Sequence, residues 1–138
     1  MLAKPHRITR GADYRATVRR GARFTGANTV AYVRMNRDSD VVRFGFIVSK
    51  SVGNAVVRNR VRRRLKAAAY QVLALLEPAA ADGPGVDIVI RALPASAQVR
   101  WATLHEEVSG AADRFLRRRT TSSRETRRSV TTEGNVRP

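Results

Sequence analysis

The sequence contains no cysteine and only 11 acidic residues among its 138. The absence of cysteine excludes disulfide bonds and thiolate metal sites, and it suits a reducing compartment, so we expect a cytoplasmic protein. No apolar run approaches the roughly 20 residues that a membrane-spanning helix needs. Residues 1–13 also lack the apolar core of a signal peptide. The sequence therefore predicts no membrane partner.

Positive charge is what the chain has in excess. It carries 27 Lys and Arg residues and a formal net charge of +16 at pH 7, and only Lys4, Lys50 and Lys66 are lysines. Arginine binds phosphate through two parallel hydrogen bonds and stacks on bases, although a genomic base-composition bias would explain the preference for arginine equally well. Because self-repulsion of this size opposes compaction, a polyanionic partner is expected.

Apolar periodicity predicts one α+β domain followed by a tail. Helices are expected at residues 13–20, 55–76 and 100–118, with Pro78 ending the second, and strands at 28–35, 41–49 and 86–92. Residues 1–9 are expected to form an extended arm. The order α-β-β-α-β-α is typical of a two-layer sandwich. The domain is therefore assigned to residues 1–118, and residues 119–138 are predicted to form a disordered basic tail.

The segment from Arg58 to Lys66 holds six cations in nine positions and no acid, yet apolar residues recur through it. On a helix, one band is predicted to pack on the sheet: Val57, Val61, Leu65, Ala68, Val72, Leu75 and Leu76. The opposite face carries Arg60, Arg62, Arg63 and Lys66, with Arg58 and Arg64 at its margins. Like charges at these spacings cost a few tenths of a kcal/mol per pair.

A solvated helix face is the simpler explanation of a charge run. Here no acid occurs between Val56 and Leu76 to relieve the repulsion, whereas a row of phosphates would offset it. We therefore expect this face to contact nucleic acid. Asn59 lies among the cations, where it would hydrogen-bond bases or ribose 2′-hydroxyls, or serve as an ordinary polar surface residue.

No catalytic or metal-binding cluster is evident in the sequence. Asp38 and Asp40 are the closest acidic pair in a polar loop, where a turn is the better interpretation. The adjacent Glu106 and Glu107 point apart on a helix, and the isolated histidines lack metal-ligand spacing. We therefore predict a binding protein with no catalytic residue and no metal site of its own.

The segment "VSKSVGNAVVRNRVRRRLKAA" resembles the signature of the protein subunit of bacterial ribonuclease P. The resemblance extends from about residue 6 to about residue 118. It includes Tyr14, Gly21, Tyr32, the strand "RFGFIVSK" and the segment "DIVIRALPAS" before the last helix. The central motif is long and specific, and residues 119–138 have no counterpart.

The resemblance implies a small mixed sheet. Its third strand would lie parallel to a neighbour through a left-handed crossover that contains the Arg-rich helix, whereas such crossovers are ordinarily right-handed. It also implies a function: a catalytic RNA, using Mg²⁺ bound mainly by that RNA, hydrolyses the phosphodiester that releases the 5′ leader of precursor tRNA. One protein per RNA would hold the single-stranded leader in a cleft between the first helix and the sheet.

The resemblance also implies roles for individual residues. Those facing the catalytic RNA would be Arg58, Asn59, Arg60, Arg62, Arg63 and Lys66. Those in or beside the leader cleft would be Tyr14, Val18, Tyr32 and Lys50. Aromatic rings stack on any base while cations follow the backbone, although Val18 stands where the family commonly has a second aromatic. From the residues alone, core packing explains both tyrosines at least as well.

Two other functions remain possible from the residues alone. A structural RNA-binding protein, such as a ribosomal protein or an RNA chaperone, would show the same charge pattern. Binding of double-stranded DNA is weaker as a hypothesis, because the Arg-rich helix is expected to bury its other face on the sheet and no helix-turn-helix spacing is evident.

Overall fold

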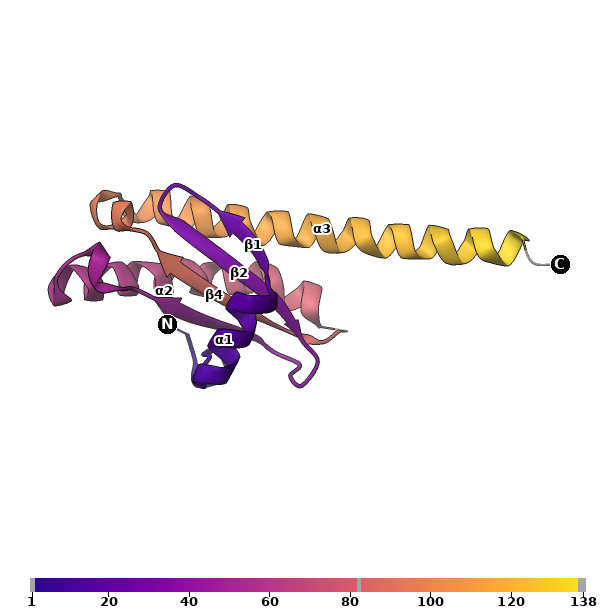
Figure 1. The fold of residues 1–138 in the computed structure, drawn as a ribbon, viewed down its shortest axis with the longest axis horizontal. Coiled ribbons are helices and arrows are strands. Elements are labelled where there is room, and N and C mark those ends of the chain that lie inside the picture. The colour runs from indigo at the N-terminus through magenta and orange to yellow at the C-terminus, as the bar shows by residue number, and fades with distance from the viewer. Residues whose placement is uncertain (1, 82, 137–138) are drawn as a thin grey trace.

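A computed structural model describes the backbone of residues 2–81 and 83–136, and the side chains of these residues except Ala79 and 120–136. The helices are α1 (Gly11–Arg20), α2 (Ala55–Ala80) and α3 (Trp101–Val136), and the strands are β1 (Ala22–Thr25), β2 (Thr29–Asn36), β3 (Val42–Ile47) and β4 (Gly85–Ala92). Short 3₁₀ turns occupy Lys4–His6, Lys50–Val52 and Pro94–Gln98. Figure 1 shows their arrangement.

The four strands form one mixed sheet in the order β1-β2-β4-β3. β2 pairs antiparallel with both β1 and β4, whereas β3 and β4 are parallel and are connected through α2. This confirms the α+β class, the mixed sheet and the parallel connection through the Arg-rich helix, while the left-handed sense of that crossover stays a prediction. The four-residue strand β1 was not predicted, because the sequence between Gly21 and Gly26 is too short to show a clear alternation.

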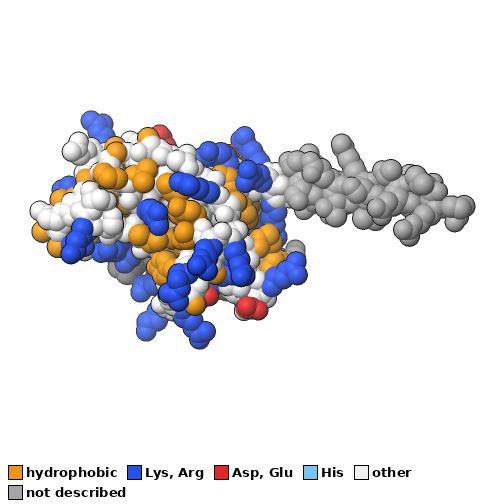
Figure 2. All heavy atoms as spheres, in the orientation of Figure 1, with side chains coloured by type: hydrophobic (Ala, Val, Ile, Leu, Met, Phe, Trp, Pro, Cys, Tyr) orange, Lys and Arg blue, Asp and Glu red, His pale blue; other side chains and the backbone are white. Residues whose placement is uncertain are grey.

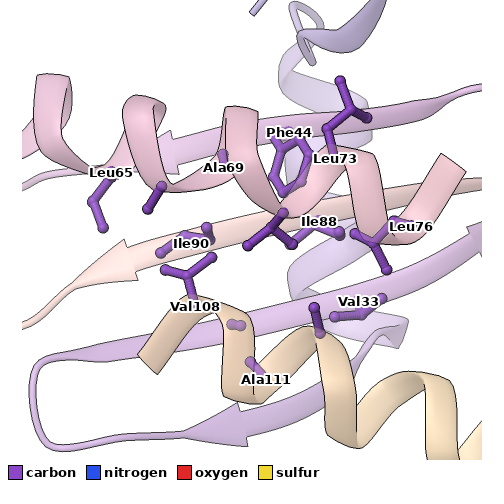
Figure 3. Close-up of a cluster of buried hydrophobic side chains, with 14 of the residues drawn as sticks. Val33, Phe44, Leu65, Ala69, Leu73, Leu76, Ile88, Ile90, Val108 and Ala111 are labelled. Atoms are coloured by element: carbon purple, nitrogen blue, oxygen red, sulfur yellow. The ribbon is translucent and has the colours of Figure 1, made fainter. Parts of the chain in front are cut away.

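α2 and α3 cover one face of the sheet and α1 lies on the other (Figure 1). The main core lies under α2 and α3, where side chains from both helices meet those of the strands (Figure 3): Leu65, Ala69, Leu76, Val108 and Ala111 point toward Val33, Phe44, Ile88 and Ile90. A smaller cluster of Ile8, Val30, Tyr32 and Val89 lies under α1, which contributes Tyr14 and Val18. Apolar residues on the face of β2 and β4 opposite the main core therefore hold α1 in place.

The start of α2 is fixed by its sequence. Gly53 has a φ of 156°, which side-chain-bearing residues rarely adopt. The Asn54 side chain accepts a hydrogen bond from the Val57 backbone N–H at 3.0 Å, which caps the helix. Because the helix begins at a defined residue, the angular position of every cation that follows is defined as well.

Two predictions about α2 were wrong. Pro78 lies inside the helix, which runs on to Ala80, because a proline in the last turn removes only one hydrogen bond near an end that frays anyway. Leu75 is 57% exposed whereas Leu76 is buried, because Leu75 lies at the margin of a sheet-facing band that is narrower than predicted.

α3 continues to Val136, beyond the expected end near Arg118. No glycine or proline occurs between Ala111 and Glu133 to end it. The side chains of residues 120–136, and residues 137–138 altogether, lie outside the described part of the chain. The disordered basic tail and the domain boundary at residue 118 therefore stay predictions.

Candidate nucleic-acid interface

The N-terminal half of α2 presents the cationic surface that its sequence predicts. Val61 and Leu65 are fully buried against the core. Of the six cations on this half of the helix, Arg60, Arg63 and Lys66 are exposed, and Arg58, Arg62 and Arg64 are half-buried. Among the side chains that the structure describes, none of these six forms an ion pair with a carboxylate. No carboxylate in the described part of the chain therefore relieves their mutual repulsion, and a polyanion would relieve it.

Hydrogen bonds fix some of these cations. Arg64 donates to the Val99 carbonyl at 2.8 Å, which ties α2 to the segment before α3. Arg62 donates to the Asn59 side-chain oxygen at 3.0 Å, so Asn59 orients an arginine while its own amide nitrogen remains available to a ligand. Asn59 is thus part of the cationic surface rather than an isolated polar residue.

A cleft of about 520 Å³ lies at the β3 edge of the sheet. The cationic residues Arg62, Arg63 and Lys66 of α2 line one side. The other residues that line it come from the N-terminal segment, α1 and β3: Leu2, Arg7, Ile8, Thr9, Tyr14, Phe44 and Phe46. The cleft thus combines the half-buried rings of Tyr14 and Phe46 with cations, and this combination binds single-stranded nucleic acid.

Tyr14 is held in the cleft by contacts with the edge strand. Its hydroxyl oxygen accepts a hydrogen bond from the Phe46 backbone N–H at 3.2 Å. Its ring lies directly over Gly45, where an added Cβ would come within 2.5 Å of Tyr14 Cε1. The ring is half-buried, so it packs on the sheet and still lines the cleft. Core packing and ligand contact are therefore compatible at this residue.

A second depression of about 300 Å³ continues on the α1 side of Tyr14. It is lined by Tyr14, Arg15, Val18, Arg19, Ile47 and Arg91. Val18 and Ile47 supply apolar surface, and three arginines surround it. In the view of Figure 2, apolar side chains are likewise surrounded by Lys and Arg on this face of the molecule.

The other two residues expected at the leader cleft lie elsewhere. Tyr32 is only 6% exposed and belongs to the cluster under α1, with the Arg91 guanidinium 5.8 Å from its ring centroid. Lys50 is exposed in the turn Lys50–Val52. Neither lines the two depressions described above. Tyr14 and Val18 are therefore brought together, and Tyr32 supports them from below.

Several lining residues were not anticipated from the sequence. The N-terminal segment contributes because Ile8 donates its backbone N–H to the Phe44 carbonyl at 2.9 Å and so lies alongside β3. This contact joins residues far apart in sequence, and no local pattern predicts it. Arg15 and Arg19 could have been found, since their one-turn spacing beside Tyr14 and Val18 is visible in the sequence.

An ionic network anchors α1 above the sheet. The fully buried Asp87 carboxylate accepts two hydrogen bonds from Arg43, at 2.9 and 2.8 Å, one from Arg34 at 3.0 Å and one from Asn36 at 2.9 Å. Arg43 also contacts Asp13 at 3.4 Å. The hydrogen bond to Asp87 raises the pKa of Arg43, against the opposing effect of burial. Because Asp13 precedes Tyr14, the network fixes the part of α1 that carries the ring.

The described residues offer no site for a catalytic metal ion. No group of three or more His, Asp or Glu side chains comes together among them. Among the described side chains, the one fully buried carboxylate is that of Asp87, and it accepts hydrogen bonds from two arginines and an amide. Within this same part of the chain, no helix is both long and apolar enough to cross a bilayer.

Comparison with known proteins identifies the family. A family model described as Ribonuclease P matches residues 2–116. The ribonuclease P protein component of Clavibacter michiganensis subsp. michiganensis is 48% identical over 117 residues, which cover 85% of this chain and 98% of that protein. The corresponding protein of Pseudarthrobacter chlorophenolicus is 45% identical over 118 residues, covering 86% and 82%.

A solved structure supports the fold. The RNase P protein from Thermotoga maritima matches with a TM-score of 0.64 at 20% identity, covering 78% of this chain and 96% of that one. The matches do not favour a ribosomal protein or an RNA chaperone. The chain therefore belongs to the ribonuclease P protein family, whose members are subunits of the endoribonuclease that removes the 5′ leader from precursor tRNA.

Proposed function

We propose that this protein subunit holds the single-stranded 5′ leader of precursor tRNA in the cleft at the β3 edge, while the cationic surface of α2 binds the catalytic RNA. One observation carries the proposal: a single cleft is lined both by the rings of Tyr14 and Phe46 and by three cations, Arg62, Arg63 and Lys66. Rings there would stack on leader bases and the cations would neutralise the leader backbone. Such contacts tolerate any sequence, as a subunit that serves many tRNA precursors requires.

In this proposal the chain contributes binding and orientation, and the RNA contributes the chemistry. Mg²⁺ would be held mainly by the RNA, since the described carboxylates do not gather into a site for it. Holding the leader beside the cationic surface would bring the scissile phosphodiester to the RNA and reduce the entropic cost of productive binding. We further propose one protein per RNA, acting in the cytoplasm.

The leader contact is tested by measuring tRNA binding to the reconstituted holoenzyme that carries the Tyr14→Leu variant. The variant is expected to weaken binding of precursor tRNA by about 1–3 kcal/mol and to leave mature tRNA unchanged, because stacking on the leader is lost. Tyr70→Leu is the matched control, since Tyr70 is 52% exposed on α2 and does not line the cleft. Equal losses for precursor and mature tRNA, or equal losses from the two variants, would exclude a leader contact at Tyr14.

Activity at low magnesium tests the division of labour. The protein alone is expected to be inert, the RNA alone slow, and the pair fast on a precursor with a 5′ extension. A protein that binds the RNA without changing cleavage would exclude the proposed role.

A further inference from the structure

Two arginines of α3 lie over one aromatic ring at the far edge of the sheet. The guanidinium carbons of Arg114 and Arg118 are 5.6 and 5.4 Å from the ring centroid of Phe24 in β1. Phe24 is only 6% exposed, whereas both arginines are exposed. The buried ring thus forms cation–π contacts with two guanidinium groups that are also exposed to solvent.

These two arginines lack the acidic partner that a neighbour on the same turn has. Arg117 pairs with Asp113 at 3.0 Å, but among the described side chains neither Arg114 nor Arg118 pairs with a carboxylate. Arg114 makes one long hydrogen bond, at 3.4 Å, from its Nε to the Gly110 carbonyl. Contact with a ring leaves the N–H donors of a guanidinium without an acceptor, and both side chains are exposed, so these donors remain available to a ligand.

The pair lies away from the cationic surface of α2. Both α2 and α3 begin at the same end of the domain, where Arg64 contacts Val99. Arg114 lies more than three turns along α3, about 20 Å from its start at 1.5 Å per residue. β1 and β3 are opposite edges of the sheet. Figure 2 shows Lys and Arg side chains gathered near the point where the described part of α3 ends.

We propose that Arg114 and Arg118 form a second binding site for backbone phosphates of the catalytic RNA. Two guanidinium groups that contact the same ring suit the anionic oxygens of neighbouring phosphates. The catalytic RNA is the better occupant than the leader, because the proposed leader cleft lies at the opposite edge of the sheet. The inference depends on the RNA partner but not on the leader cleft. The protein would then bind the RNA through two separate surfaces, which would fix the orientation of the protein on the RNA as well as increase the affinity.

The test is binding of the full-length double variant Arg114→Gln/Arg118→Gln to the catalytic RNA alone, without tRNA, across a series of salt concentrations. Glutamine keeps an aliphatic stem over Phe24, so the fold is expected to survive, as circular dichroism will check. We expect about tenfold weaker binding near physiological salt. The slope of log affinity against log salt should become shallower by about 1.5, since roughly 0.7–0.9 is lost per phosphate contact.

Two further variants distinguish a specific phosphate-binding site from a general effect of positive charge. Arg117→Gln removes a cation from the same turn that is already paired with Asp113, and it should weaken binding less than about twofold. Phe24→Leu keeps an apolar residue but removes the ring. Affinity for the catalytic RNA is expected to fall about threefold, because the cation–π contacts that position the two guanidinium groups are lost.

An unchanged salt slope in the double variant, or an equal loss in Arg117→Gln, would overturn the proposal. So would unchanged binding of the catalytic RNA together with weaker binding of precursor tRNA by the reconstituted holoenzyme, because that result would assign the site to the substrate. A negative result for Arg114 and Arg118 would not bear on the proposed leader cleft. That proposal is tested separately, by comparing how Tyr14→Leu changes the binding of precursor and mature tRNA.

Discussion

The backbone N–H of Phe46 donates a hydrogen bond to the hydroxyl oxygen of Tyr14 at 3.2 Å, so a side chain of α1 satisfies a donor on the edge strand β3. An edge strand otherwise leaves such groups to solvent or to another chain. The bond therefore satisfies one edge donor and sets the position of the ring that lines the cleft.

Removing the hydroxyl alone separates these two effects. Tyr14→Phe is expected to lower the free energy of unfolding by about 1 kcal/mol, because the Phe46 N–H loses its acceptor. The ring remains, so discrimination between precursor and mature tRNA should be largely retained. Urea unfolding and tRNA binding measured on the same preparation check both expectations. A variant as stable as the parent would show that the hydrogen bond contributes little.

Gly45→Ala is expected to displace the Tyr14 ring, because the added methyl would lie 2.5 Å from Tyr14 Cε1. Overpacking of this kind costs about 1–3 kcal/mol, and precursor binding should weaken while mature tRNA binding does not. Gly110→Ala is the control, since a Cβ there meets nothing within 4 Å. In that helix it should add about 0.5–1 kcal/mol of stability. Similar stability changes for the two variants would contradict the close contact.

Asp87→Asn should destabilise the protein by about 3 kcal/mol, because it leaves Arg34 and Arg43 without the buried carboxylate that they share. Asp113→Asn, at an exposed pair with Arg117, should cost less than about 1 kcal/mol. Chemical denaturation of both variants checks the contrast. A loss at Asp87 no larger than at Asp113 would mean that the network does not anchor α1.

The pH dependence of stability has a defined sign at Arg43. Its pKa is raised in the folded protein, so the stabilisation is fully present below the unfolded-state pKa and is lost only as pH rises through the folded value. Both values lie far above neutrality. Titration of Arg43 should therefore contribute no change in unfolding free energy between pH 6 and pH 9, as denaturation in matched buffers will show. A slope removed by Arg43→Gln would contradict this.

The double variant Arg60→Ala/Arg63→Ala should bind the catalytic RNA more weakly and with a shallower salt dependence, because two exposed cations of the α2 surface are lost. Arg37→Ala, at an exposed cation in the turn after β2, removes one charge outside α2, so the loss per cation removed can be compared between the two variants. Filter binding over a range of salt gives both quantities. Unchanged slopes would remove this helix from the RNA interface.

Sequence patterns predicted best where the structure is determined locally. The apolar period of α2 placed Val61 and Leu65 inside, and both are buried. Of the cations that it placed on the opposite face, Arg60, Arg63 and Lys66 are exposed and Arg62 is half-buried. The same period placed Leu75 inside wrongly, because the width of a buried band depends on what packs against it. It also could not show that residues 7–9 line the cleft, since pairing of Ile8 with Phe44 joins distant parts of the chain.

Tyr14 and Tyr32 show most clearly what sequence patterns cannot predict. Tyr14 and Tyr32 carry the same chemistry and the same family-based expectation, yet one lines the cleft and the other is buried under α1. Tyr32 lies on β2, an inner strand, whereas Tyr14 lies on α1 and packs over β3, which the sheet order places at the edge. Strand order is a property of the whole fold and leaves no mark on either residue's neighbours in the sequence.

The cap at Asn54 has a consequence for how this protein tolerates insertions and deletions. α2 has a fixed first residue and a core-facing stripe, so the cationic face is determined by counting from Asn54. One added residue between Asn54 and Val61 would rotate the cap and the first cations by about 100° relative to the rest of the helix. Substitutions here change the strength of a contact, whereas changes of length redirect it. We expect related chains to vary in composition across residues 54–66 while keeping its length constant.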